Sequence, residues 1–229
     1  MGISAETRLV ALLGHPVAHS LSPRMQNAAF AARGLDWAYV ALDIPPERLA
    51  EAVRGLAAGG FAGANVTAPH KLAAAGLCDE ADAESVNTLV FEDGRVLGTS
   101  TDAAVLDGQT FERAVIVGDG GAARAFRAAL PGARVFSRRG DWPPDVEGAD
   151  LVVHATPVRD QALFELHEGQ TLVDLPYPES ATARSARDGG ATVIDGLEVL
   201  VRQGAASFER WTGVPAPLDV MRNAVRSAP

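Results

Sequence analysis

Short apolar runs bounded by turn residues recur through the first hundred residues. The runs have the length of buried strands and occur at residues 9–13, 37–42, 63–67, 88–91 and 95–98. The last two flank an Asp-Gly dipeptide, which predicts a hairpin. Helices are predicted at residues 22–33, where Ser22 is a candidate N-cap before Pro23, and at 46–56, where apolar side chains recur at helical spacing.

Beyond Asp102 the pattern predicts a regular alternation of strand and helix. The expected strands are residues 115–117, 134–136, 151–154, 172–175 and 192–194. Such alternation is typical of βαβ units and a parallel sheet. Residues 196–211 carry apolar side chains along one helical face, and a final helix is expected at about 218–225. The chain is therefore expected to have an α/β fold of two domains.

Composition narrows the classes of function. The chain has 229 residues, a net charge of −9 and a pI near 5.0, which argues against nucleic acid or an anionic membrane as the main partner. One cysteine excludes a disulfide framework, and the five histidines show no metal-binding spacing, so no metal is expected. Without a signal peptide or a membrane-length apolar run, we expect a cytoplasmic protein. We expect it to be a monomer or a homodimer.

A glycine turn joins a predicted strand to a predicted helix at residues 115–124. In a Rossmann fold, Gly118 would permit the tight turn, Gly120 would let the backbone approach a pyrophosphate, and Ala123 would allow close helix–strand packing. The helix N-terminus would direct N–H groups at the anion. An ordinary strand–turn–helix connection is the alternative interpretation of this segment.

The residues after the second strand of this domain indicate the cofactor. NAD-specific folds commonly place an acidic residue there. Here the strand leads into Ser137, Arg138 and Arg139, and the first acid is Asp141. Two guanidinium groups suit the 2′-phosphate of NADP, through bidentate contacts and stacking on adenine. The alternative is a solvated pair of arginines on a loop.

Six segments occur in the order seen in one family. They are Gly14-His15-Pro16 with Ser20-Leu21-Ser22-Pro23, residues 65–71 (Asn-Val-Thr-Ala-Pro-His-Lys), 85–88 (Ser-Val-Asn-Thr), 100–102 (Ser-Thr-Asp), 174–177 (Asp-Leu-Pro-Tyr) and 195–203, which begins Asp-Gly-Leu-Glu. The chain resembles the shikimate dehydrogenases from Gly14 to about Gly213. The resemblance implies an N-terminal substrate domain, residues 1–102, and a C-terminal Rossmann-type NADP domain with a parallel sheet, residues 103–204. It also implies that helices in about 205–229 pack back on the first domain and that the chemistry lies in the cleft between the two.

The resemblance also implies roles for residues of the first domain. Lys71 and Asp102 would be the catalytic pair at the hydroxyl that becomes a carbonyl, with Lys71 either exchanging a proton or only donating a hydrogen bond. Ser20 and Ser22 would bind the substrate carboxylate. The remaining substrate contacts would come from Thr67, Asn87, Asp102 and Gln203 at the ring hydroxyls and from Tyr177 near the carboxylate.

The cofactor residues implied are those of the glycine turn, the arginine loop and two later turns: Gly118, Gly120, Gly121, Ala122, Ser137, Arg138, Arg139, Thr156 and Gly196. The expected activity is the NADPH-dependent reduction of 3-dehydroshikimate to shikimate, in aromatic amino-acid biosynthesis. A relative acting on quinate, or a lapsed dehydrogenase that only binds a shikimate-like ligand, are the alternatives.

Several residues depart from the family pattern. Asp119 stands in the glycine turn in place of alanine, and Ser100 and Ala103 replace the asparagine and glycine around Asp102. His154 replaces an asparagine at the end of a cofactor-domain strand, and we expect it to be packed and hydrogen-bonded. The connections 102–115 and 139–150 are short. These departures concern the cofactor domain more than substrate binding.

Overall fold

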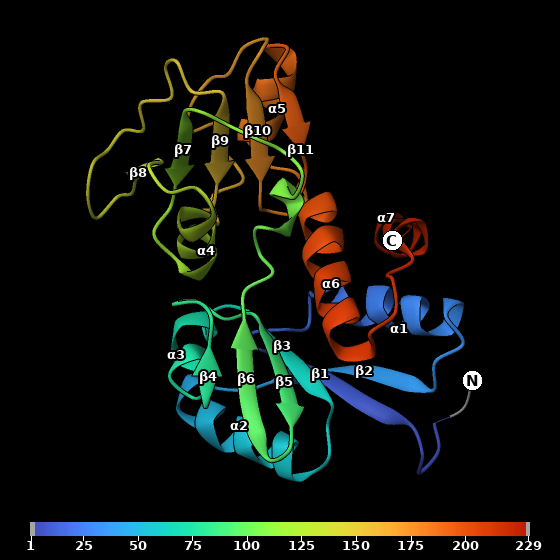
Figure 1. Cartoon of the computed structure of the whole chain (residues 1–229). Coiled ribbons are helices and arrows are strands. Elements are labelled where there is room, and N and C mark those ends of the chain that lie inside the picture. Colours follow the sequence, from blue (N-terminus) through green and yellow to red (C-terminus); the bar gives the residue numbers. More distant parts are fainter. Residues whose placement is uncertain (1–2, 228–229) are drawn as a thin grey trace. The chain divides into compact units, whose positions relative to one another are not determined.

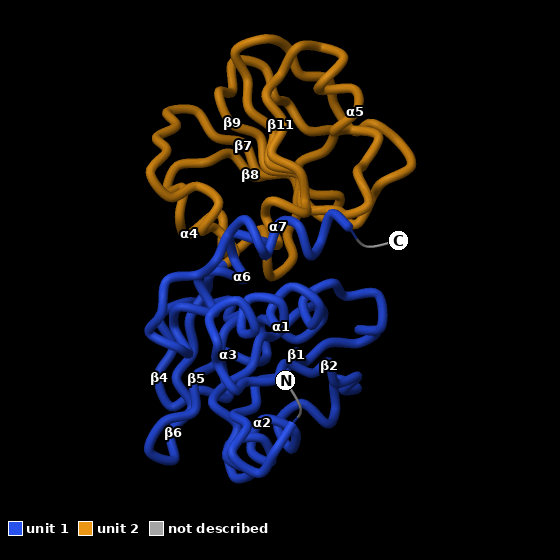
Figure 2. Tube along the Cα trace, turned by 90° about the vertical axis from the view of Figure 1, so that its right-hand side faces the viewer, with its two compact units in different colours: residues 1–101, 201–229 blue, residues 102–200 orange. Residues whose placement is uncertain are grey.

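The structure, a computed structural model, describes residues 3–227 and divides into two compact units. Unit 1 comprises residues 1–101 and 201–229, and unit 2 comprises residues 102–200 (Figure 2). Helix α6, Gly196–Thr212, begins in unit 2 and ends in unit 1. Unit 1 is therefore assembled from the two ends of the chain, with unit 2 inserted between them.

Unit 1 contains a mixed six-stranded sheet (Figure 1). Its strands are β1 Arg8–Gly14, β2 Trp37–Asp43, β3 Gly63–Val66, β4 Glu80–Ala81, β5 Thr88–Glu92 and β6 Arg95–Thr99, in the order β2-β1-β3-β5-β6-β4. Strands β1, β2 and β3 are parallel, whereas β5 runs antiparallel to both β3 and β6. Asp93 and Gly94 have φ values of 50° and 75°, as a tight type I′ hairpin turn requires. The predicted Asp-Gly hairpin is confirmed.

Helices cover both faces of this sheet. They are α1 Ser22–Ala32, α2 Leu49–Ala58, α3 Lys71–Ala75, the second half of α6, and α7 Leu218–Arg226. On one face, Leu49 and Val53 of α2 pack with Leu13 of β1 in an apolar cluster. On α1, the Phe30 ring stacks on that of Phe208 of α6, with centroids 5.3 Å apart. Helix α6 is thereby fixed to unit 1 by buried aromatic contact.

Unit 2 contains a five-stranded parallel sheet. Its strands are β7 Ala114–Val117, β8 Arg134–Phe136, β9 Leu151–His154, β10 Thr171–Asp174 and β11 Thr192–Ile194, in the order β11-β10-β9-β7-β8. Helix α4, Gly121–Ala129, follows β7 and packs Phe126 against Ile116 on one face. Helix α5, Ala181–Asp188, contributes Ala183 and Ala186 to the cluster that contains Val115. The expected parallel sheet is confirmed.

Two details differ from the sequence prediction. Regular alternation of strand and helix is wrong for the middle of unit 2, because β8, β9 and β10 are joined by segments without a helix. Loop residues Phe164 and Leu166 fill the apolar cluster on that face instead. The five-residue helix α3 and the two-residue strand β4 were not expected; both are too short to leave a periodic signal.

Candidate functional site

Three of the sequence motifs converge at one edge of the unit 1 sheet. The edge is formed by the carboxyl ends of β1, β3 and β6 and the start of β5. The Val66 N–H donates to the Asn87 carbonyl at 2.8 Å, and the Val86 N–H donates to the Lys71 carbonyl at 3.0 Å. These backbone bonds place segments 65–71 and 85–88 side by side. The Asn87 N–H, in turn, donates to Thr99 at the end of β6, 3.1 Å away.

Asn87 forms hydrogen bonds to several members of a buried polar network at this edge. Its Nδ2 donates to Thr101 Oγ1 at 3.0 Å and to Gln203 Oε1 of α6 at 3.2 Å. Its Oδ1 accepts the Thr101 N–H at 2.8 Å. The structure thus brings together two predicted substrate residues, Asn87 and Gln203, although 116 positions separate them along the chain.

Sequence reasoning missed two members of this network, Thr101 and Ser207. Both side chains are buried, and the Ser207 hydroxyl lies 2.8 Å from Thr88 Oγ1 and 3.2 Å from Thr101 Oγ1. Asn65 Nδ2 also donates to Ser207 Oγ, at 2.9 Å. The available signal was small: Ser207 lies one helical turn after Gln203, on the same face of α6.

The paired serines lie where α1 begins. The expectation that Ser22 caps this helix is wrong, because the first helical bond already reaches the carbonyl of Leu21 from the Met25 N–H. Ser22 is the first helical residue, and its N–H donates to Ser20 Oγ at 3.3 Å. Thr67, which follows β3, packs its methyl group directly over Gly14 at the end of β1.

Lys71 and Asp102 are the last residues of two of the converging motifs, 65–71 and 100–102. Lys71 is the first residue of α3, partly buried, and it is the only lysine in the chain. Asp102 is buried and directly follows Thr101, whose N–H and hydroxyl both contact Asn87; it is the first residue of unit 2.

In unit 2 the predicted glycine turn follows β7. Gly118 has a φ of +137°, and a Cβ there would lie 2.5 Å from the backbone oxygen of Ala155. Only glycine satisfies both conditions, so its predicted role in the tight turn is confirmed. Gly120 is the N-cap of α4 with extended backbone, and among the described residues none beyond its two chain neighbours comes within 4 Å of the position of a Cβ. Gly121 and Ala122 open the helix, and Ala123 is buried against the sheet as predicted.

The arginine loop follows β8, next to the glycine turn in the sheet. The Gly118 N–H donates to the Phe136 carbonyl at 2.8 Å, and the chain then turns at Ser137. The Arg138 guanidinium lies over the Trp142 ring, 5.6 Å from its centroid. Arg139 Nη1 lies 3.8 Å from Asp119 Oδ2 of the glycine turn. The unusual acid of that turn therefore faces an arginine.

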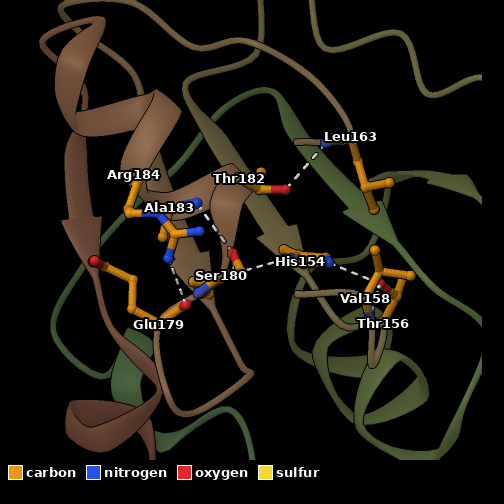
Figure 3. Close-up of polar contacts among 10 residues, drawn as sticks. His154, Thr156, Val158, Leu163, Glu179, Ser180, Thr182, Ala183 and Arg184 are labelled. Carbon is orange, nitrogen blue, oxygen red and sulfur yellow. Dashed lines mark hydrogen bonds and ion pairs between the residues drawn. The ribbon is translucent and has the colours of Figure 1, made fainter. Parts of the chain in front are cut away.

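Thr156 follows β9 and is held from two sides. Its Oγ1 lies 2.7 Å from His154 Nε2 and accepts the Val158 N–H at 3.2 Å (Figure 3). His154 is fully buried and its Nδ1 lies 2.6 Å from Asp174 Oδ1. The expectation that His154 is packed and hydrogen-bonded is confirmed.

Tyr177 and Gly196 lie beyond the end of β10. The Tyr177 carbonyl accepts a hydrogen bond from Arg159 Nη1 at 3.4 Å, within unit 2. A Cβ on Gly196 would meet the backbone oxygens of Leu175 and Pro176. Close packing at the start of α6 accounts for this glycine.

Within residues 3–227, no group of three or more histidine, cysteine, aspartate or glutamate side chains is arranged to hold a metal ion. None of the helices in the same range is both long and apolar enough to cross a membrane.

Comparison with known proteins identifies the family. Residues 12–89 match the shikimate dehydrogenase substrate-binding domain, and residues 196–226 match the shikimate 5′-dehydrogenase C-terminal domain. Shikimate dehydrogenase (NADP(+)) of Methanopyrus kandleri is 40% identical, covering 98% of this chain and 97% of the relative. The enzyme of the same name from Anaeromyxobacter dehalogenans is 39% identical, covering 98% of each chain.

Solved structures agree with the sequence comparison. Shikimate dehydrogenase from Aquifex aeolicus has a TM-score of 0.90 and 32% identity, covering 99% of this chain and 100% of that one. The Thermus thermophilus enzyme, solved in complex with NADP(H) and shikimate, has a TM-score of 0.83 and 31% identity, covering 96% of this chain and 98% of that one. The chain therefore belongs to the shikimate dehydrogenase family.

Proposed function

We propose that this protein is an NADP-dependent shikimate dehydrogenase, in which unit 1 binds shikimate or 3-dehydroshikimate and unit 2 binds NADP(H). The observation that carries the proposal is the convergence of Asn87, Thr101 and Gln203 with the segment that holds Lys71, in a chain of this family. The relatives described above bear the name shikimate dehydrogenase, which favours this activity over quinate oxidation or simple ligand binding.

The residues of unit 2 fit a dinucleotide. Helix α4 begins at Gly121, after the N-cap Gly120, without a side-chain cap and without an acid in its first turn, so its N–H groups are available to a pyrophosphate. The space where a Gly120 Cβ would be is open, which allows a phosphate to approach the backbone. Arg138 and Arg139 follow the neighbouring strand and would bind the 2′-phosphate. When bound, the nicotinamide supplies or accepts the hydride.

The network around Asn87 suits a polyhydroxylated ring. Such a ring presents hydroxyl groups that both donate and accept, and each one left unsatisfied on burial costs about 1–3 kcal/mol. Amide side chains supply donors and acceptors together, and here Asn87 Nδ2 lies 3.2 Å from Gln203 Oε1. Thr67 at the end of β3 would add a hydroxyl, and Ser20 and Ser22 at the start of α1 would receive the substrate carboxylate.

Lys71 would act on the substrate oxygen that changes between carbonyl and hydroxyl. Reduction of a ketone requires a proton at that oxygen, and an ammonium can donate it or stabilise the developing charge by a hydrogen bond. The chain has 20 basic residues, and all but Lys71 are arginine. A guanidinium stays protonated throughout the physiological range, whereas an amine can release its proton. Asp102 would orient the same hydroxyl and balance the charge.

Shikimate-dependent reduction of NADP, followed by nicotinamide absorbance, tests the activity. Lys71→Ala and Lys71→Arg should both lower kcat by about 10²–10⁴-fold, with a much smaller effect on shikimate affinity. Because Lys71 is the only lysine, selective ¹⁵N-lysine labelling gives one side-chain amine signal, whose titration can be followed directly. A pH-rate profile that follows this titration supports proton exchange, and one that ignores it supports hydrogen bonding alone. Near-normal turnover in both variants would refute the role.

A further inference from the structure

A continuous chain of hydrogen bonds runs through the interior of unit 2 and ends at Thr156. The N–H of Ala183, in the first turn of α5, donates to Ser180 Oγ at 3.1 Å, and Ser180 Oγ donates to Asp174 Oδ1 at 2.9 Å. His154 Nδ1 contacts the same carboxylate oxygen at 2.6 Å, and its Nε2 lies 2.7 Å from Thr156 Oγ1 (Figure 3). The Ser180, Asp174 and His154 side chains are all fully buried.

The direction of each bond follows from the chemistry of its members. An ionised carboxylate only accepts, so His154 Nδ1 carries a proton and donates to Asp174. When the ring is neutral, Nε2 is a lone pair, and the Thr156 hydroxyl must donate its proton inward to it. When the ring is protonated, Nε2 is itself a donor. Thr156 Oγ1 then accepts from both His154 and the Val158 N–H, and its own proton is free to point elsewhere.

Thr156 stands where an outward donor would meet a ligand. His154 and Asp174 end neighbouring parallel strands and are in register with each other and with Val117 of β7. Ligands of open parallel sheets bind at this carboxyl edge. The backbone oxygen of Ala155 lies against Gly118 of the glycine turn, so the loop that bears Thr156 adjoins the proposed pyrophosphate site. Thr156 is partly exposed, whereas the ring behind it is not.

We propose that His154 is a positioning residue for the cofactor: its protonation turns the Thr156 hydroxyl from an internal donor into a donor to an oxygen of the bound dinucleotide. The inference rests on the proposed NADP site of unit 2. Asp174 on β10 is the charged group that contacts the ring among the described residues, while β7 and the 155–170 segment contribute Val117 and Phe164, which do not titrate. Cofactor binding and proton uptake by His154 are therefore linked, and each favours the other.

The test compares NADP⁺ affinity at about pH 6 and pH 8 in matched variants. His154→Asn keeps an amide N–H to face Asp174 but frees Thr156 at every pH, and Thr156→Val removes the hydroxyl. His167→Asn, on an exposed loop of the same unit, is the control. The 2′-phosphate of NADP⁺ itself titrates, but it does so identically with the wild-type protein and with each variant. Its effect therefore cancels when the affinities of two of these proteins are divided by one another. Between about pH 6 and pH 8, the NADP⁺ affinity of the wild-type protein and of the control should fall about tenfold more than that of His154→Asn. A tenfold difference corresponds to one hydrogen bond. Thr156→Val should bind weakly at both pH values.

The protonation of the His154 ring in the wild-type protein provides a second measurement, which needs no variant to fold. With ¹⁵N-labelled histidine, the chain gives five sets of ring signals, and the Nε2 signal of His154 should shift toward that of a protonated nitrogen when NADP⁺ is added. Equal pH dependence of NADP⁺ affinity in the wild-type and His154→Asn proteins, or a His154 Nε2 signal that NADP⁺ does not move, would overturn the role of His154 alone. Failure of the wild-type protein to bind NADP⁺ at either pH would overturn the proposed function as well.

Discussion

Replacement of Ser207 by alanine tests whether the buried network holds α6 to the substrate-binding edge of unit 1. The Ser207 hydroxyl contacts Asn65 Nδ2 at 2.9 Å, Thr88 Oγ1 at 2.8 Å and Thr101 Oγ1 at 3.2 Å, and it donates to the Gln203 carbonyl at 3.0 Å. The side chain is fully buried, so water cannot replace these bonds without entering the core.

The magnitude follows from what each partner retains. Asn65 Nδ2 keeps its bonds to the Asn87 carbonyl and to Thr88, and Thr101 keeps its bonds to Asn87. No partner is wholly orphaned, so the loss should be about 2 kcal/mol, within the range of about 1–3 for buried hydrogen-bonding groups. Alanine favours a helix over serine by up to about 0.5 kcal/mol, which leaves a net destabilisation of about 1.5 kcal/mol.

Urea unfolding followed by tryptophan fluorescence measures this loss. Trp37 and Trp211 lie in unit 1 and Trp142 in unit 2, so a Trp142→Phe background reports on unit 1 alone. Ser185→Ala, in the middle of α5 of unit 2 and outside the network, serves as the control for helix propensity and is measured in the protein that keeps Trp142. The Ser207→Ala protein should show a raised KM for shikimate with little change in kcat, because Thr88 and Thr101, which contact Asn87, each lose a hydrogen-bond partner. A change below about 0.5 kcal/mol, the size of the helix-propensity effect alone, together with an unaltered KM would refute the reasoning.

Three further predictions concern the cofactor turn and the single thiol. Gly118→Ala should destabilise unit 2 by about 2–4 kcal/mol, because φ at Gly118 is +137° and the added Cβ meets a backbone oxygen. Gly120→Ala should fold normally yet bind NADP⁺ less tightly, because a Cβ there has open space in the protein but lies where the phosphate would approach. Equal stability of the two variants in urea would contradict this prediction. Asp119→Asn should increase NADP⁺ affinity a few-fold at low salt and less at high salt, because it removes a negative charge from the glycine turn and releases Arg139. Calorimetric titration with NADP⁺ measures the affinity, and Asp141→Asn is the control. An unchanged affinity would contradict the prediction. Burial, with help from Asp79 and Asp82, raises the pKa of Cys78 to about 11, so its alkylation should be slow at neutral pH and accelerate with pH until that value; rapid labelling by iodoacetamide near pH 7 would show the thiol to be more accessible than the structure has it.

The sequence was most informative where a local pattern and the fold have the same cause. Apolar runs such as residues 9–13 and 151–154 became strands because they are buried on both faces of a sheet. The glycine turn was readable because positive φ at Gly118 leaves a signature in residue type. The missing helices between β8 and β10 were not readable, since loop residues such as Phe164 supply the same apolar contacts without periodicity.

The sequence predicted which residues belong to the candidate site better than it predicted the hydrogen bonds among them. The motifs named Asn87 and Gln203, but their direct contact depends on how α6 packs across the sheet, which no local pattern encodes. Ser207 and Thr101 are ordinary residues in composition and gain their role only through burial beside Asn87. Ser22 was misassigned because the start of α1 is set one residue earlier, at the carbonyl of Leu21, than its Ser-Pro sequence indicates.

The division of the chain gives unit 1 a particular order of assembly during translation. Its sheet is complete once β6 has been made, but Phe208, Trp211 and Met221, which cover that sheet and α1, are synthesised after all of unit 2. A nascent chain ending anywhere before α6 exposes the apolar surface that these residues later bury. The inserted unit can fold on the ribosome before α6 and α7 emerge, so these helices complete unit 1 only after unit 2 has been made.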